Sequence, residues 1–151
     1  TTATSLAMLL WHLSEDEALQ REVRREVLAE CSEGDGEAYP LLSACIKETL
    51  RMWPAAPLIV RQALEPAPPY EGIELPVGTV AIVAPWLLGR SGHLWNDPQF
   101  FRPQRFVGVD CGSGLHPFAW IPFGYGSRSC VGRHIALAEL KIFAMSLRRR
   151  F

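Results

Sequence analysis

The sequence lacks three features that would each define a class of protein. Its four cysteines show no paired spacing and no Cys-x-x-Cys motif, which excludes a disulfide scaffold and fits a reducing compartment. The formal net charge is only −1 at pH 7, so the composition does not point to nucleic acid as a partner. The longest apolar run, residues 6–13, contains His12 and is too short to cross a bilayer, and no signal peptide is visible.

What is present indicates one domain. The chain has 151 residues, 48% of them hydrophobic, which is enough to bury a single core. It begins with TTATSLAM, without an initiator methionine and inside a predicted helix, and a helical pattern still continues at Phe151. We therefore interpret residues 1–151 as part of one domain, truncated at both ends. A membrane anchor in a preceding part and the location within the cell are left open.

Hydrophobic periodicity and breaker residues predict a mainly helical fold with a minor β-sheet. Residues 58–83 change to short β segments, and residues 84–122 are irregular and rich in proline and aromatic side chains. The run SEDE predicts a capping box in which Ser14 and Glu17 satisfy each other's backbone donors at the start of the second helix. Helices are expected over residues 1–13, 15–30, 40–53 and 131–147.

The third predicted helix carries two charged residues of opposite sign. Glu48 and Arg51 lie three positions apart, so their side chains can touch. Both project away from the apolar face of that helix, which contains Leu42, Ile46 and Leu50. Judged on this helix alone, the simplest interpretation is a solvated ion pair that contributes only a few tenths of a kcal/mol.

The segment FGYGSRSCVG, residues 123–132, places Cys130 at the start of the last predicted helix. Its glycines indicate backbone that turns tightly or approaches another group. The helix dipole, nearby amide donors and Arg128 all favour the thiolate, which is a metal ligand or a nucleophile. Three interpretations stay open from spacing alone: a small buried hydrophobe, an axial thiolate ligand to haem iron, and zinc. The zinc site would consist of Cys111, His116, Cys130 and His134.

Several motifs in the order of one family make the pattern more specific. The last of them, Phe123-x-x-Gly126-x-Arg128-x-Cys130-x-Gly132, resembles the haem-binding loop of the cytochrome P-450 family at every defining position. Upstream lie three further resemblances. Thr1-Thr2 is similar to the threonine pair of the long helix over the haem, and Glu48-x-x-Arg51 is similar to the family's second signature. The segment FRPQRF at residues 101–106 is similar to the segment that precedes the haem loop. The resemblance spans the whole chain, as the C-terminal third of the family's catalytic domain.

The resemblance implies a cofactor and its surroundings. Haem b would be bound through the Cys130 thiolate, with Phe123, Gly126, Arg128, Gly132 and Arg61 around the cofactor. The family places the Glu48–Arg51 pair in a buried network beneath the haem, joined by an arginine that corresponds to Arg105. Losing one member of such a network would cost several kcal/mol rather than tenths. Gln104 stands where the family more often has glutamate.

The resemblance also implies an activity. The enzyme would be a mono-oxygenase that inserts one atom of molecular oxygen into a C–H bond of a small apolar substrate. Electrons would come from a flavoprotein reductase or a ferredoxin. Thr1 and Thr2 would be catalytic through oxygen binding and proton delivery, and the substrate would be lined by Ala55, Ala56, Pro57, Leu58, Ile59 and Val60. An isomerase or dehydratase that uses the same haem without external electrons is the alternative within the family.

Overall fold

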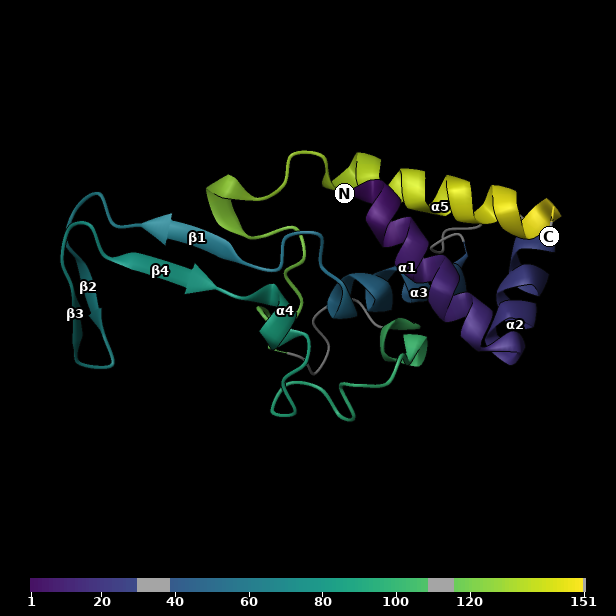
Figure 1. Cartoon of the computed structure of the whole chain (residues 1–151), viewed down its shortest axis with the longest axis horizontal. Helices are drawn as coiled ribbons and strands as arrows, with labels where there is room; N and C mark the ends of the chain where they lie inside the picture. The colour runs from purple at the N-terminus through teal and green to yellow at the C-terminus, as the bar shows by residue number, and fades with distance from the viewer. Residues whose placement is uncertain (30–38, 109–115, 151) are drawn as a thin grey trace.

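The computed structural model describes residues 1–29, 39–108 and 116–150. The long helices gather on one side of the molecule and the strands on the other (Figure 1). In chain order the elements are α1 (Thr2–Glu15), α2 (Glu17–Leu28), α3 (Pro40–Met52), β1 (Ile59–Gln62), β2 (Ala67–Tyr70), β3 (Ile73–Leu75), β4 (Val80–Val83), α4 (Pro85–Leu88), the single-turn helices η1 (Pro103–Phe106) and η2 (Gly126–Arg128), and α5 (Arg133–Arg150). The predicted mainly helical fold with a minor sheet is confirmed.

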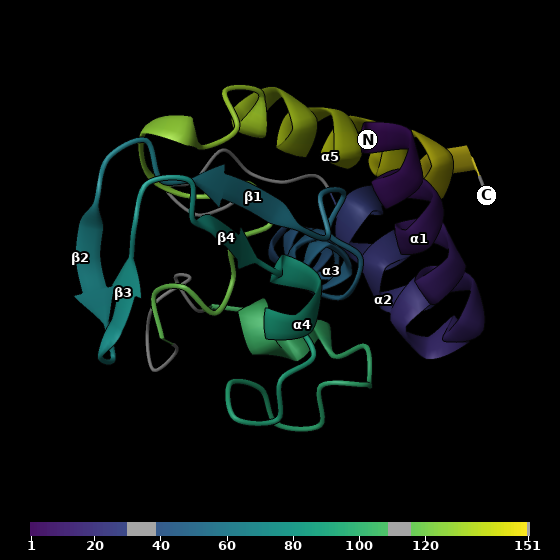
Figure 2. The ribbon, with the colours of Figure 1, turned by 60° about the vertical axis from the view of Figure 1, so that its left-hand side comes forward.

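One apolar core joins α1, α2, α3 and α5, and α5 lies across the first two helices (Figures 1 and 2). In α2 the buried residues Leu19, Val23 and Val27 form one apolar stripe, because residues four apart share one helix face. None of the described helices has the length and apolarity that a membrane span requires. The buried members of the core are Leu9, Leu13, Leu19, Val23, Val27, Leu42, Cys45, Ile46, Leu50, Leu140 and Ala144.

The boundary between α1 and α2 differs from the predicted capping box. Ser14 lies in the last turn of α1, where its Oγ donates a hydrogen bond to the carbonyl of Trp11 at 2.7 Å. The N-cap of α2 is Asp16, whose Oδ1 accepts a hydrogen bond from the amide of Leu19 at 3.0 Å. The predicted Ser14 cap is wrong because α1 continues to Glu15 and takes Ser14 into its own final turn. A carboxylate at the N-cap also interacts favourably with the helix dipole.

The strands form two antiparallel pairs, β1 with β4 and β2 with β3. In the first pair Ile59 lies opposite Val83, and Gln62 lies opposite Val80. Gly78 has φ of +87° in the turn between β3 and β4, a conformation that glycine adopts without a steric penalty. The β1–β4 pair extends away from the long helices (Figure 1), and the start of β1 brings Ile59 to the edge of the cavity described next.

Candidate active site

Cys130 ends a loop that turns back on itself immediately before α5. The amide of Cys130 donates a hydrogen bond to the carbonyl of Phe123 at 2.8 Å, which closes the loop. Within it, Gly124 and Gly126 have φ of +71° and +73°, values that side-chain-bearing residues rarely adopt. The helix begins at Arg133, slightly later than the sequence suggests. Cys130 is exposed, so its interpretation as a small buried hydrophobe is wrong.

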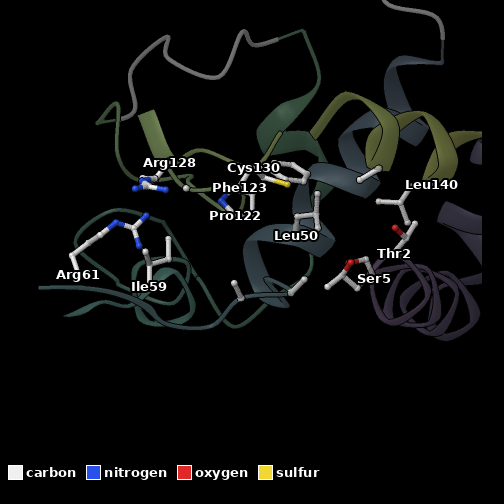
Figure 3. Close-up of a pocket in the computed structure, with 15 residues that line it drawn as sticks. Thr2, Ser5, Leu50, Ile59, Arg61, Pro122, Phe123, Arg128, Cys130 and Leu140 are labelled. Carbon is white, nitrogen blue, oxygen red and sulfur yellow. The ribbon is translucent and has the colours of Figure 1, made fainter. Parts of the chain in front are cut away.

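A cavity of about 290 Å³ lies beside this loop (Figure 3). Its walls are mainly apolar and come from four parts of the chain. Leu50 belongs to α3, Ile59 to β1, Phe123 to the loop, and Leu140 to α5. Side chains far apart in sequence thus line a common space, which suits an apolar ligand.

The polar groups of the cavity are separated along its length. Figure 3 shows the guanidinium groups of Arg61 and Arg128 at one end, Thr2 and Ser5 of α1 at the other, and the sulfur of Cys130 between them. Guanidinium groups form strong charge-assisted hydrogen bonds with carboxylates. The cavity therefore offers a thiol toward its middle and two cations at one end, in otherwise apolar surroundings.

The structure brings together most of the residues that the sequence singles out. Gly126 and Gly132 are not among the residues that line the cavity, although a Cβ at Gly132 would lie 3.9 Å from the Cys130 sulfur. A Cβ at that distance makes ordinary van der Waals contact, so an alanine at position 132 would not clash with the thiol. The predicted residues that do line the cavity are Thr1, Thr2, Ala55, Ala56, Ile59, Arg61, Phe123, Arg128 and Cys130.

The segment expected to line the substrate is only partly at the cavity. Pro57, Leu58 and Val60 are exposed and do not line it. Within β1, Ile59 and Arg61 line the cavity, and Val60 between them points to the opposite face because side chains alternate along a strand. Ser5 is a lining residue that the sequence reasoning missed, and the residue is only 4% exposed. Its position four residues after Thr1 was the available signal, because residues i and i+4 share one helix face.

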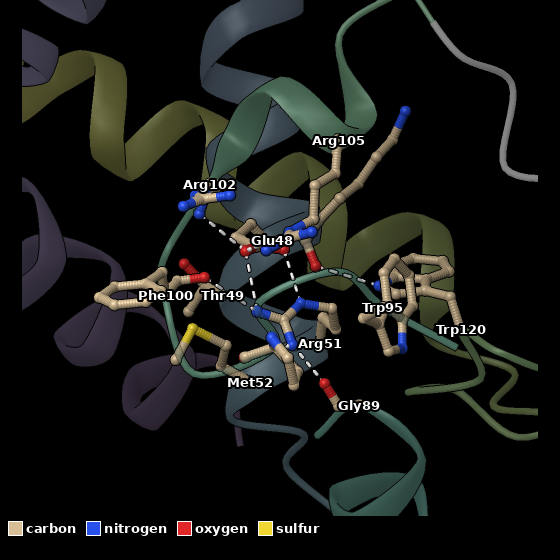
Figure 4. A network of polar contacts seen from close by, with 12 residues as sticks. Glu48, Thr49, Arg51, Met52, Gly89, Trp95, Phe100, Arg102, Arg105 and Trp120 are labelled. Atoms are coloured by element: carbon tan, nitrogen blue, oxygen red, sulfur yellow. Dashed lines mark hydrogen bonds and ion pairs between the residues drawn. The ribbon is translucent and has the colours of Figure 1, made fainter. Parts of the chain in front are cut away.

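Glu48 and Arg51 form a buried ion pair, with both side chains 0% exposed (Figure 4). Arg51 donates from Nε to Oε2 at 2.7 Å and from Nη2 to Oε1 at 2.9 Å. The amide of Arg102 donates to Oε1 at 2.8 Å, and Nε of Arg105 lies 3.3 Å from the same oxygen. The solvated pair expected from the helix alone is wrong, because residues 98–105 cover this face of α3.

The remaining donors of Arg51 bind backbone carbonyls. Nη1 donates to the carbonyl oxygens of Gly89 and of Pro98, the latter at 2.9 Å, and Nη2 donates to that of Phe100 at 3.3 Å. Gly89 also packs directly on the backbone of Arg51, and a Cβ at this position would overlap the Arg51 carbonyl oxygen. Sequence reasoning missed Gly89, because its φ of −63° is ordinary and its need for a hydrogen side chain comes from tertiary packing.

Two further titratable groups are perturbed by burial. Desolvation lowers the pKa of His12, the nearby Glu48 opposes this shift, and Arg51 adds to it. The ring of His12 stacks on Phe101 at 4.1 Å, and its Nε2 accepts a hydrogen bond from Trp53 Nε1 at 3.0 Å. Burial raises the pKa of the Cys45 thiol, so Cys45 is an inert core residue.

The zinc interpretation receives no support from the described residues. Within residues 1–29, 39–108 and 116–150, no three His, Cys, Asp or Glu side chains come together as a metal site. His116 instead accepts a hydrogen bond at Nδ1 from the amide of Phe118 at 3.2 Å. Cys111, the fourth proposed ligand, lies outside the described residues.

Comparison with known proteins identifies the family. The family model described as cytochrome P-450 matches residues 1–151. The chain belongs to the cytochrome P-450 family. It is 31% identical over 159 residues to cytochrome P-450 4d1 of Drosophila melanogaster, 34% over 160 residues to the mitochondrial sterol 26-hydroxylase of Rattus norvegicus, and 37% over 162 residues to cytochrome P-450 93G1 of Oryza sativa subsp. japonica. These matches cover 98–100% of the chain but only 30–31% of each relative, so the chain spans about a third of their length.

Membership of the cytochrome P-450 family implies a haem held by a cysteine thiolate. The residues of the cavity fit such a group on two counts. The Cys130 thiol is exposed at an apolar wall, and Arg61 and Arg128 supply cations at one end. A macrocycle with two carboxylate substituents matches this distribution of apolar and cationic groups.

Proposed function

We propose that this chain supplies the thiolate side of the active site of a haem-thiolate mono-oxygenase. The enzyme inserts one atom of molecular oxygen into a C–H bond of a small apolar substrate, with electrons from a redox partner. The observation that carries the proposal is the Cys130 thiol at the wall of an apolar cavity, between two cations and the hydroxyl groups of α1. The haem, when bound, supplies the activation of oxygen.

The roles around the cofactor follow from the contacts. Cys130 would hold the haem through its thiolate, and the hydrogen bond from its amide to the Phe123 carbonyl fixes the backbone that carries the sulfur. The half-buried ring of Phe123, which also lines the cavity, would pack on the haem side of the loop. Arg61 and Arg128, which line one end of the cavity, would pair with the carboxylates of the haem by charge-assisted hydrogen bonds.

The roles on the substrate side come from α1 and from the start of β1. Thr1 and Thr2 hold and transfer a proton through their hydroxyl oxygens, since both line the cavity. Ala55, Ala56 and Ile59 present small apolar side chains, which suits a substrate without charge. The presence of threonines in the cavity favours the mono-oxygenase over an isomerase or dehydratase, which needs no proton delivery to oxygen.

Electron transfer requires a partner protein. Arg133 and His134 are exposed in the first turn of α5, close to the Cys130 loop, and Lys141 is half-buried further along the same helix. A cationic surface near the thiolate suits an acidic flavoprotein or ferredoxin. We propose this end of α5 as its docking region.

The test is a reduced carbon-monoxide difference spectrum of the protein encoded by the longest open reading frame that contains these residues. A strongly red-shifted Soret band is expected, and Cys130→Ser should abolish it. Cys45→Ala is the matched control, because it removes the buried thiol of the core and should retain the band. A folded protein without a haem band, or a band that survives in Cys130→Ser, would refute the proposal.

A further inference from the structure

Trp120 joins the loop that carries Cys130 to the centre of the fold. Its indole Nε1 donates a hydrogen bond to the carbonyl of Lys47 in α3 at 3.0 Å (Figure 4). Its ring meets Phe106 at 6.0 Å and meets Phe123 edge to face at 6.3 Å, with an interplanar angle of 71°. Trp120 is also packed against both apolar clusters of the described residues, the main helical core and the smaller one around Trp95.

The loop itself provides little support for Cys130. Side chains from Tyr125 to Cys130 are exposed, and η2 has no buried residue. Phe123 is the half-buried residue from which the loop departs, and its carbonyl accepts the amide of Cys130 at 2.8 Å. A displacement of the Phe123 backbone would therefore move the acceptor that fixes the Cys130 backbone.

The acceptor of the Trp120 hydrogen bond, Lys47, lies in a firmly held part of α3. Lys47 directly precedes Glu48, whose carboxylate is completely buried and accepts hydrogen bonds from Arg51 and from the Arg102 amide. A helix held by such a network resists displacement, because any movement would leave buried charges without partners. The Trp120 hydrogen bond thus ties the start of the loop to the most constrained part of α3.

We propose that Trp120 is a positioning residue that fixes the Phe123–Cys130 loop relative to α3 and thereby holds the Cys130 thiolate in its orientation as a ligand. This inference rests on the function proposed above. Trp120 does not line the cavity, so it acts through Phe123 and not by contact with the ligand.

The experiment compares two variants that each lose one indole hydrogen bond. Trp120→Phe keeps an aromatic ring but removes the donor to Lys47. Trp95→Phe is the matched control: Trp95 donates from Nε1 to the carbonyl of Leu88 at 3.1 Å and packs on Phe106 at 5.7 Å, away from the loop. Both variants are made in the protein from the longest open reading frame. The readout is the rate at which the red-shifted carbon-monoxide band gives way to the blue-shifted band that marks loss of the thiolate ligand.

We expect the thiolate band of Trp120→Phe to be lost about fivefold faster than in the unmodified protein, the factor that corresponds to one neutral hydrogen bond. Trp95→Phe should lower the urea midpoint of unfolding to a similar extent, while its rate of thiolate loss stays within about twofold. Equal rates in the two variants would show that only global stability matters and would overturn the inference, while the proposed function would stand. An unmodified protein without a thiolate band would overturn both.

A measurement on the unmodified protein guards against a Trp120 variant that fails to fold. If one opening event controls the loop, the indole proton of Trp120 and the amide proton of Cys130 should exchange with solvent at the same opening free energy. Widely different opening free energies for the two protons would overturn the inference without any substitution.

Discussion

Replacing Glu48 with glutamine removes one negative charge from the centre of the molecule and changes its shape very little. The carboxylate is 0% exposed and is surrounded by donors: Nε and Nη2 of Arg51, the amide of Arg102 and Nε of Arg105. A glutamine offers one acceptor oxygen in place of two and directs an NH₂ group at other donors. Arg51, also 0% exposed, would be left as a buried cation without its counter-ion.

The magnitude follows from the burial of both partners. Removing one member of a buried ion pair destabilises a protein by about 3–5 kcal/mol, because the desolvation of the remaining charge is no longer offset. That is a large fraction of the roughly 5–15 kcal/mol by which a domain is typically stable. The equilibrium constant for folding should fall by about two to four powers of ten. An exposed pair of the same residue types contributes only about 0.3–0.5 kcal/mol.

The assay is equilibrium urea unfolding followed by circular dichroism, on the protein from the longest open reading frame. Arg21→Gln is the matched control, because Arg21 pairs with Glu17 on the exposed surface of α2 at 3.2 Å. The midpoint for Glu48→Gln should decrease strongly at an unchanged slope, and that for Arg21→Gln hardly at all. If the two variants lost similar stability, the argument from burial would be refuted.

Two further changes test features that depend on packing. Gly89→Ala should lower the free energy of unfolding by about 1–3 kcal/mol in the same assay, because its methyl group would overlap the Arg51 carbonyl oxygen. Gly92→Ala is the control: a Cβ at Gly92 meets nothing within 4 Å, so this variant should change stability by less than about 0.5 kcal/mol. Burial lowers the pKa of His12 below its ordinary value of 6.5. As pH falls, His12 is therefore protonated at a higher pH in the unfolded chain than in the folded protein. The free energy of unfolding should consequently decrease as pH falls through 6.5. His12→Gln keeps an acceptor for Trp53 and should remove this part of the pH dependence; an unchanged pH profile would contradict the assignment.

The sequence by itself determined the family, the class of fold and Cys130 as the candidate metal-ligating residue. The spacing of residues 123–132, after the Glu48–Arg51 motif, was specific because several motifs in the order of one family are far more specific than any one of them alone. The apolar stripe of α2 was equally readable, since residues four apart share one helix face. Local periodicity and motif spacing are properties of the chain alone, and they need no knowledge of what packs on what.

Only the tertiary structure decided where charges are buried and which residues support the loop. Helix periodicity placed Glu48 and Arg51 on a polar face, yet residues 98–105 cover that face and supply the donors that make burial tolerable. Packing between distant segments also explains why Gly89, which lies on the Arg51 backbone, has no room for a side chain. It likewise brings Trp120 to Lys47, 73 positions away in sequence. Contacts between distant segments arise from packing in three dimensions, and no local pattern encodes them.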